Sequence, residues 1–209
     1  MKTCVIIGAA PCENLDFIDK EILNNAFVIA ADGGYTTACN AGVKVNAFIG
    51  DLDSNMVAPN CDDLTILPCV KDCTDVHTAI LRAISDGYKK IILVGCTNGR
   101  ADHYFANVAL LELIAKNGAE GVIVDGGNEI RFISEGMYRV PRSKRYFSIL
   151  PIDEEITGVT LIGFKYLLDK ATLHRDYPSG VSNEWVRDIA TVVIESGRAL
   201  MIFSEDNQL

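Results

Sequence analysis

Short apolar runs alternate with amphipathic stretches through the first 126 residues, and this alternation restricts the fold more than any other feature. The runs suit strands buried on both faces, and the stretches between them place apolar residues at helical spacing. We expect strands at residues 5–7, 27–31, 47–49, 65–67, 91–94 and 121–124. We expect helices at residues 17–23, 76–84 and 104–115, and another that follows Asp32-Gly33-Gly34 and runs through Asn40. The alternation predicts an α/β domain with a mostly parallel, Rossmann-like sheet covered on both faces.

The hydrophobic period changes near residue 130. From there the chain continues as short apolar segments with Gly or Pro between them, and helical spacing disappears. We expect strands at residues 131–133, 138–140, 146–150, 159–162, 190–194 and 200–203. Closely spaced short strands are typical of an antiparallel β-sandwich or barrel, and we favour the sandwich. The sequence therefore predicts an α/β domain at residues 1–127 and a β-sandwich domain at residues 128–209.

Charge and composition exclude several classes of protein. The net charge of −9 argues against binding to nucleic acid, which requires a basic face. No run approaches the roughly 20 apolar residues of a membrane helix. The apolar run at residues 4–10 soon meets Pro11 and Glu13, so a buried strand explains it better than a signal peptide. The seven cysteines are odd in number and form no C-x-x-C pair, which indicates reduced thiols and a cytoplasmic location.

Four consecutive expected strands are followed by carboxylates, glycines and a few cations. Ligands bind beyond the carboxyl ends of the strands in a parallel sheet, so these segments should converge on one edge. The segments are Asp32-Gly33-Gly34, Asp51-Leu52-Asp53-Ser54, Lys71-Asp72-Cys73-Thr74-Asp75 and Asn98-Gly99-Arg100-Ala101-Asp102-His103.

The first two segments each have a structural and a functional interpretation. Asp32-Gly33-Gly34 could form a simple turn, or its glycines could let backbone amides approach a phosphate. Asp51 and Asp53 could belong to a capping arrangement around Ser54. Alternatively they could share a hard cation, because two carboxylates one residue apart repel unless a positive charge lies between them.

The other two segments are also open to both interpretations. Thr74 is a suitable N-cap for the helix that follows, and helix N-termini also serve phosphate sites. Arg100 and Asp102 could form a surface ion pair, or a phosphate clamp beside a metal or substrate carboxylate. His103 and Asn107 could contact the ligand or only anchor their helix. The common phosphate-binding and nucleophile motifs, G-x-x-x-x-G-K-[ST], G-x-G-x-x-G and G-x-S-x-G, are absent. What remains is a carboxylate-and-arginine site for a metal–phosphate substrate.

The ordered set of motifs resembles the thiamine pyrophosphokinase family over nearly the whole chain. The matching segments are Asp32-Gly33-Gly34, Gly50-Asp51-Leu52-Asp53-Ser54, Asp72-Cys73-Thr74-Asp75, Gly99-Arg100-Ala101-Asp102-His103 and Ser182-Asn183. One departure is Asn98, which stands where members often carry a second glycine before the arginine.

The resemblance implies an enzyme that transfers pyrophosphate from ATP to the hydroxyl of thiamine, giving thiamine diphosphate and AMP. It implies that Mg²⁺ is bound by Asp51, Asp53 and Asp75. The implied catalytic set is Asp51, Asp53, Asp75, Arg100 and Asp102, with either Asp75 or Asp102 as a possible general base. The implied ATP and phosphate ligands are Asp32, Gly33, Gly34, Lys71, Thr74, Arg100, His103 and Asn107.

The resemblance also implies a homodimer whose active site lies at the subunit interface. Ser182 and Asn183 would then hydrogen-bond the pyrimidine of thiamine. Trp185 could stack on a thiamine ring or be an ordinary core aromatic. Two other functions fit the same carboxylate edge: a different Mg²⁺-dependent nucleotide phosphotransferase, or a nucleotide-sensing protein whose β domain binds a partner.

Overall fold

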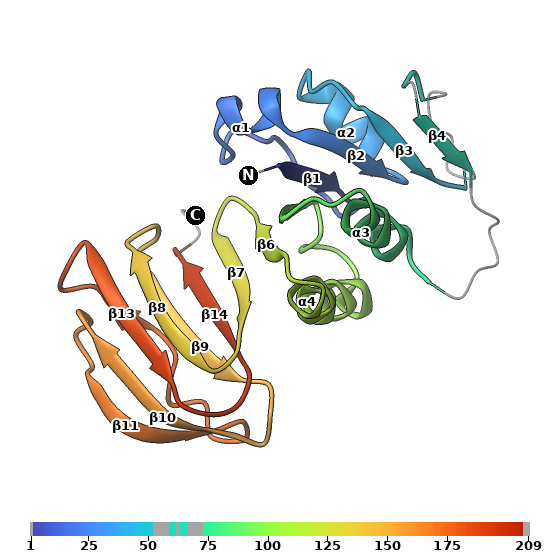
Figure 1. Cartoon of the computed structure of the whole chain (residues 1–209). Helices are drawn as coiled ribbons and strands as arrows, with labels where there is room; N and C mark the ends of the chain where they lie inside the picture. The colour runs from blue at the N-terminus through green and yellow to red at the C-terminus, as the bar shows by residue number, and fades with distance from the viewer. Residues whose placement is uncertain (1, 52–58, 62, 67–72, 207–209) are drawn as a thin grey trace. The chain divides into compact units, whose positions relative to one another are not determined.

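The computed structural model describes residues 2–51, 59–61, 63–66 and 73–206, and the chain divides into two compact units (Figure 1). Unit 1 is Met1–Gly126 and unit 2 is Gly127–Leu209. The division falls in the glycine pair where the hydrophobic period changes. A glycine pair suits such a junction, because glycine adopts turn conformations without steric penalty.

Unit 1 contains a parallel sheet in the order β4-β3-β2-β1-β5-β6. Its strands are β1 (Thr3–Ile7), β2 (Phe27–Ala31), β3 (Ala47–Gly50), β4 (Asp63–Ile66), β5 (Lys90–Val94) and β6 (Glu120–Val124). The order reverses between β1 and β5, where the chain passes from one half of the sheet to the other. That reversal is the topological switch point at which open α/β sheets bind ligands.

The helices of unit 1 are α1 (Lys20–Asn25), α2 (Gly34–Asn40), α3 (Asp75–Ser85) and α4 (Ala101–Lys116). They cover both faces of the sheet, with α3 and α4 packed together (Figure 1). Val5 and Ile7 belong to one core cluster with Tyr35 and Ala38 of α2. Cys4 and Ile6, which alternate with them along β1, are also fully buried, so they face the opposite side. Among the described residues, no helix is both long and apolar enough to cross a bilayer.

Unit 2 is an antiparallel sandwich of two four-stranded groups, β12-β9-β14-β7 and β11-β10-β13-β8. Its strands are β7 (Asn128–Ile133), β8 (Gly136–Pro141), β9 (Tyr146–Pro151), β10 (Glu155–Ile162), β11 (Leu168–His174), β12 (Asn183–Glu184), β13 (Ile189–Ile194) and β14 (Ala199–Ser204). Buried side chains from both groups, including Phe147 of β9 and Val192 of β13, form one core cluster. The predicted fold class, a mostly parallel α/β sheet followed by an antiparallel β-sandwich, is confirmed.

Several predicted boundaries were wrong. The first helix was expected at residues 17–23 but begins at Lys20, because Asp19 caps it by accepting a hydrogen bond from the Glu21 N–H at 2.8 Å. The fourth strand is displaced by two residues at its start, to Asp63–Ile66. The prediction also missed β11 and β12. In β11 most side chains are exposed, and β12 has two residues, so neither shows the alternation of a half-buried strand.

All six cysteines within the described ranges are free. Burial raises the pKa of Cys4 and of Cys96 to about 12, so both thiols stay protonated and pack as small apolar side chains.

Candidate functional site

A cavity of about 700 Å³ opens at the switch point of unit 1. Its walls come from the loops after β1, β2 and β5 and from the first turns of α3 and α4. Six of the predicted site residues line it: Asp32, Thr74, Asp75, Arg100, His103 and Asn107. The volume is in the usual range for small-molecule and cofactor sites.

Two glycines let the loops after β1 and β5 meet at the base of this cavity. The Gly8 N–H donates to the Val94 carbonyl at 2.7 Å, and the Ala10 N–H donates to the Gly95 carbonyl at 2.9 Å. A Cβ on Gly8 would lie 2.6 Å from the Gly95 oxygen, and a Cβ on Gly95 would lie 2.6 Å from the Gly8 oxygen. Ala9, Ala10 and Pro11 therefore line the cavity, although the sequence analysis did not include this loop. The sequence feature that indicates this loop is the Gly8-Ala9-Ala10-Pro11 turn directly after the first buried strand.

In the Asp32-Gly33-Gly34 segment one residue lines the cavity and another is required for close packing. Asp32 has φ +50°, and its N–H donates to the Ile49 carbonyl at 2.9 Å, so the residue is tied to the end of β3. Asp32 lines the cavity. A Cβ on Gly34 would lie 1.9 Å from the Ile7 carbonyl oxygen, so only glycine allows α2 to begin this close to β1.

The N-cap and the first residues of α3 line the cavity. The Thr74 hydroxyl accepts from the His77 N–H at 3.2 Å, which confirms the predicted N-cap. Asp75 is the first residue of the helix, and its neighbour Cys73 also lines the cavity. Unpaired amides and the helix dipole make such an end favourable for anions.

Arg100 and Asp102 form an ion pair at the start of α4. Arg100 Nε lies 3.1 Å from Asp102 Oδ1, and Arg100 Nη2 lies 2.5 Å from Asp102 Oδ2. This guanidinium, together with the His103 N–H that donates to the same carboxylate, lowers the pKa of Asp102 to about 2. Both side chains are largely exposed. The ion-pair interpretation is therefore correct for this structure, and it leaves Arg100 on the cavity wall.

Asn107 is buried beneath the loop that carries Arg100. Its Nδ2 donates to the Cys96 carbonyl at 2.9 Å, which anchors the loop after β5 to α4. The same loop departs from regular geometry at Asn98, with φ +28°, and Gly99, with φ +88°. Asn107 thus lines the cavity and also holds its wall in place.

The predicted Mg²⁺ ligands fit that cation in donor chemistry. Asp51 is half-buried directly after β3, and Asp75 begins α3, which packs against β3. Carboxylate oxygens are the protein ligands that Mg²⁺ prefers, completed by water and substrate phosphates. In the ranges that the structure describes, no three metal-ligating side chains cluster. Asp53, the third predicted carboxylate, lies outside the described residues, as does the predicted phosphate ligand Lys71.

In unit 2, Ser182 and Asn183 lie side by side but in different environments. Ser182 is exposed and has a left-handed backbone with φ +57°. Asn183 is buried, and its amide is used within the protein: Nδ2 donates to the Tyr166 carbonyl, and Oδ1 accepts from the N–H groups of Tyr166 and Glu184. An amide has four hydrogen-bonding positions, and these three bonds within the described residues occupy three of them.

Trp185 packs in an aromatic cluster. Its ring centroid lies 4.9 Å from that of Phe164, 6.0 Å from that of Phe203 and 6.1 Å from that of Phe147. The ring is half-buried, so most of its contacts are with the core of unit 2.

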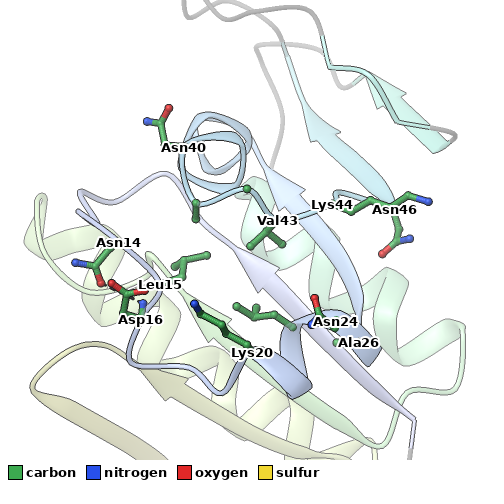
Figure 2. A pocket seen from close by; sticks show the side chains of 13 residues that line it. Asn14, Leu15, Asp16, Lys20, Asn24, Ala26, Asn40, Val43, Lys44 and Asn46 are labelled. Carbon is green, nitrogen blue, oxygen red and sulfur yellow. Dashed lines mark hydrogen bonds between the residues drawn. The ribbon is translucent and has the colours of Figure 1, made fainter.

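A second cavity in unit 1, of about 830 Å³, lies among residues before α1, α1 itself and the chain after α2 (Figure 2). Ala26 and Asn46 place it near the amino ends of β2 and β3, away from the edge where parallel sheets bind ligands. Asn46 Oδ1 is occupied by the Val28 N–H at 2.8 Å. No predicted site residue lines this cavity, so the switch-point cavity is the candidate site.

The chain is similar to known proteins along its whole length. A family model described as "Thiamin pyrophosphokinase, catalytic domain" matches residues 18–123, and one described as "Thiamin pyrophosphokinase, vitamin B1 binding domain" matches residues 137–201. The thiamine pyrophosphokinase of Bacillus subtilis (strain 168) is 30% identical over an alignment of 215 positions, which covers 99% of this chain and 100% of that protein.

Solved structures agree. The crystal structure of thiamine pyrophosphokinase from Bacillus subtilis has a TM-score of 0.88 at 29% identity and covers 98% of this chain and 100% of its own. That of the Geobacillus thermodenitrificans protein has a TM-score of 0.86 at 30% identity, covering 99% of each chain. Together with the two-unit fold and the switch-point cavity, these matches show that the chain belongs to the thiamine pyrophosphokinase family.

Proposed function

We propose that the switch-point cavity binds Mg–ATP, and that the pyrophosphoryl group passes from there to the hydroxyl of thiamine. One observation carries this assignment: six predicted site residues, five of them predicted to bind ATP or phosphate and the sixth, Asp75, to bind Mg²⁺, line a single cavity at the edge where parallel sheets bind ligands. The products are thiamine diphosphate and AMP.

In this proposal Asp51, Asp53 and Asp75 hold Mg²⁺ against the polyphosphate. When bound, the ion neutralises phosphate charge and orients the chain of phosphates. The donor chemistry of Asp51 and Asp75 supports this role. Asp51 follows β3 and Asp75 begins α3, so the packing of α3 against β3 sets the relative positions of these two carboxylates.

Cationic and amide groups of the chain stabilise the transferred group. Arg100 on the cavity wall is placed to contact phosphate oxygens, and the start of α3 at Thr74 offers backbone amides and a favourable dipole. The thiamine oxygen attacks the β-phosphorus, the bond from that phosphorus to the α,β-bridging oxygen breaks, and AMP leaves. Such transfer depends mainly on positioning and charge neutralisation.

Asp102 acts in this proposal by holding Arg100. A carboxyl with a pKa of about 2 is a weak proton acceptor near neutral pH, since general bases work best when their pKa is close to the operating pH. Asp102 is therefore disfavoured as the acceptor of the thiamine hydroxyl proton, and Asp75 would accept that proton through a carboxylate oxygen that does not bind Mg²⁺. Asp75 lines the cavity, whereas Asp102 is engaged with Arg100 beside it.

We further propose that unit 2 binds thiamine through Ser182 and Asn183, and that the chain forms a homodimer with its active site at the subunit interface. Large apolar side chains that are exposed in unit 2 accord with an assembly, because apolar surface that gathers into one patch marks protein–protein contacts. They include Met137, Leu167, Val186 and Ile189. Light scattering should give twice the chain mass of 22.8 kDa.

The free cysteines accord with a cytoplasmic location, which cell fractionation would test.

The decisive assay incubates the chain with ATP, Mg²⁺ and thiamine and separates the products. AMP and thiamine diphosphate support the proposal; ADP, or turnover that does not depend on thiamine, overturns it. Asp51→Asn and Asp75→Asn should each lower kcat by about 100-fold or more, as expected for groups that position a metal. Asp16→Asn is the matched control, because Asp16 is exposed and lines the other cavity.

A further inference from the structure

The segment before β12 pairs with β9 through an irregularity at Ser182. Asn183 pairs with Phe147, and the Ile149 N–H donates to the Gly180 carbonyl at 2.8 Å. Three residue steps separate Gly180 from Asn183, but only two separate Phe147 from Ile149. The segment therefore carries one extra residue opposite β9, which is the defining feature of a β-bulge.

Ser148 of β9 satisfies the backbone at this bulge with its side chain. The Ser182 N–H donates to Ser148 Oγ at 3.0 Å. Ser148 is only 8% exposed, so water is a poor substitute for this acceptor. A non-glycine residue in the left-handed region is strained by about 1 kcal/mol or more, so a specific partner is needed to hold it.

The residue after the bulge is held from the other side. Asn183 clasps the main chain of Tyr166 with two hydrogen bonds, at 2.9 Å and 2.7 Å. The backbone of Ser182 is thus confined between Ser148 and Asn183. These two, with Thr97 and Asn107 of unit 1, are the four buried polar residues in the described part of the chain. In unit 2 the buried polar side chains therefore gather at the bulge.

We infer that Ser148 is a positioning residue for thiamine binding: its hydroxyl holds the bulge that directs the exposed Ser182 side chain toward the substrate. The inference rests on the proposed role of Ser182 in binding thiamine. Bulges re-aim side chains next to active sites, and a fixed donor or acceptor binds without an ordering penalty. Ser148 itself need not touch thiamine.

Steady-state kinetics of the full chain test this role. Ser148→Ala should raise the KM for thiamine about fivefold, equivalent to one lost hydrogen bond, with kcat and the KM for ATP unchanged. Ser148→Thr keeps the hydroxyl and should restore the KM. Ser204→Ala, a half-buried serine on the neighbouring strand β14, is the matched control. An unchanged KM for thiamine in Ser148→Ala, or an equal rise in the KM for ATP, overturns the inference.

The rate of amide hydrogen exchange at residue 182, measured by NMR, reports on the bulge independently of any assay of activity. Exchange should be faster in Ser148→Ala and restored in Ser148→Thr; unchanged exchange in Ser148→Ala overturns the inference. Ser182→Ala separates the two claims. If it leaves the KM for thiamine unchanged, the proposed role of Ser182 is wrong and the inference falls with it. If it raises that KM while Ser148→Ala does not, only the role of Ser148 is wrong.

Discussion

Asn183 encloses the main chain of Tyr166: its Oδ1 accepts the Tyr166 N–H at 2.9 Å, and its Nδ2 donates to the Tyr166 carbonyl at 2.7 Å. The two residues are 17 positions apart, and the side chain that joins them is 5% exposed. This amide acts as a short piece of backbone, since it presents one acceptor and one donor in the way a neighbouring strand would. Asn183 therefore stabilises the turn at Tyr166 whatever it contributes to substrate binding.

Replacing this amide should destabilise the protein. Asn183→Ala leaves the polar groups of Tyr166 without their partners, which should lower the free energy of unfolding by about 2 kcal/mol. Urea unfolding measures the change. Ser182→Ala on the adjacent exposed residue should stay within about 0.5 kcal/mol of the parent. If Asn183→Ala is as stable as the parent, the two hydrogen bonds from Asn183 to the Tyr166 main chain contribute nothing to the free energy of unfolding.

The Arg100–Asp102 pair makes a prediction about pH. The pKa of Asp102 is lowered to about 2 from 3.8, so the folded state holds this proton less tightly than the unfolded state does. The stabilisation is present above pH 4 and is lost as the pH falls toward 2. Asp102 therefore stays ionised wherever the enzyme works. We expect Asp102→Asn to leave the acidic limb of the kcat profile at the same pH. A displaced limb would instead identify Asp102 as the titrating base.

Gly34 should tolerate no side chain. A Cβ at this position would lie 1.9 Å from the Ile7 carbonyl oxygen, and moving the backbone of β1 away from it would cost much of the free energy of packing. Gly34→Ala should lower the free energy of unfolding by about 3 kcal/mol or more. Gly126→Ala is the control, because nothing lies within 4 Å of its added Cβ, and it should be nearly neutral. Comparable urea midpoints for the two variants would contradict the close packing of α2 against β1.

Trp185 should behave as a core residue. Its indole Nε1 has no hydrogen-bond partner among the described residues, so Trp185→Phe loses no hydrogen bond and should keep the KM for thiamine. Trp185→Ala empties a site against Phe164 and Phe147 and should lower the free energy of unfolding by about 3 kcal/mol. A large rise in the KM of Trp185→Phe at unchanged melting temperature would support stacking on thiamine instead.

The sequence predicted helices and strands well wherever the residues that specify them are close together in the chain. The buried strands of unit 1 follow from runs such as Val5–Ile7, and the N-cap at Thr74 was recognisable because its partner His77 is three residues away. The convergence of strand-end residues on one edge follows from parallel topology alone. Placing Asp32, Asp75 and Arg100 around one cavity needed no knowledge of individual side-chain contacts.

Contacts between distant residues could not be predicted in this way. The pair Ser148–Ser182 spans 34 positions, and the close approach of Gly34 to Ile7 spans 27. The two-residue strand β12 has no period of its own and exists because β9 offers it partners. The packing of Trp185 against Phe164 likewise joins rings that are distant in the sequence.

The switch-point site itself shows the same division. The order of strands and acidic segments along the chain was enough to predict a magnesium–polyphosphate site, because short-range hydrophobic periodicity dictates a parallel sheet and a parallel sheet gathers its strand ends. The anchoring of Asn107 on Cys96 and the bulge at Ser182 emerged only in the folded chain. Those features depend on which polar groups are left buried after the sheets pack, and that outcome is a property of the whole fold.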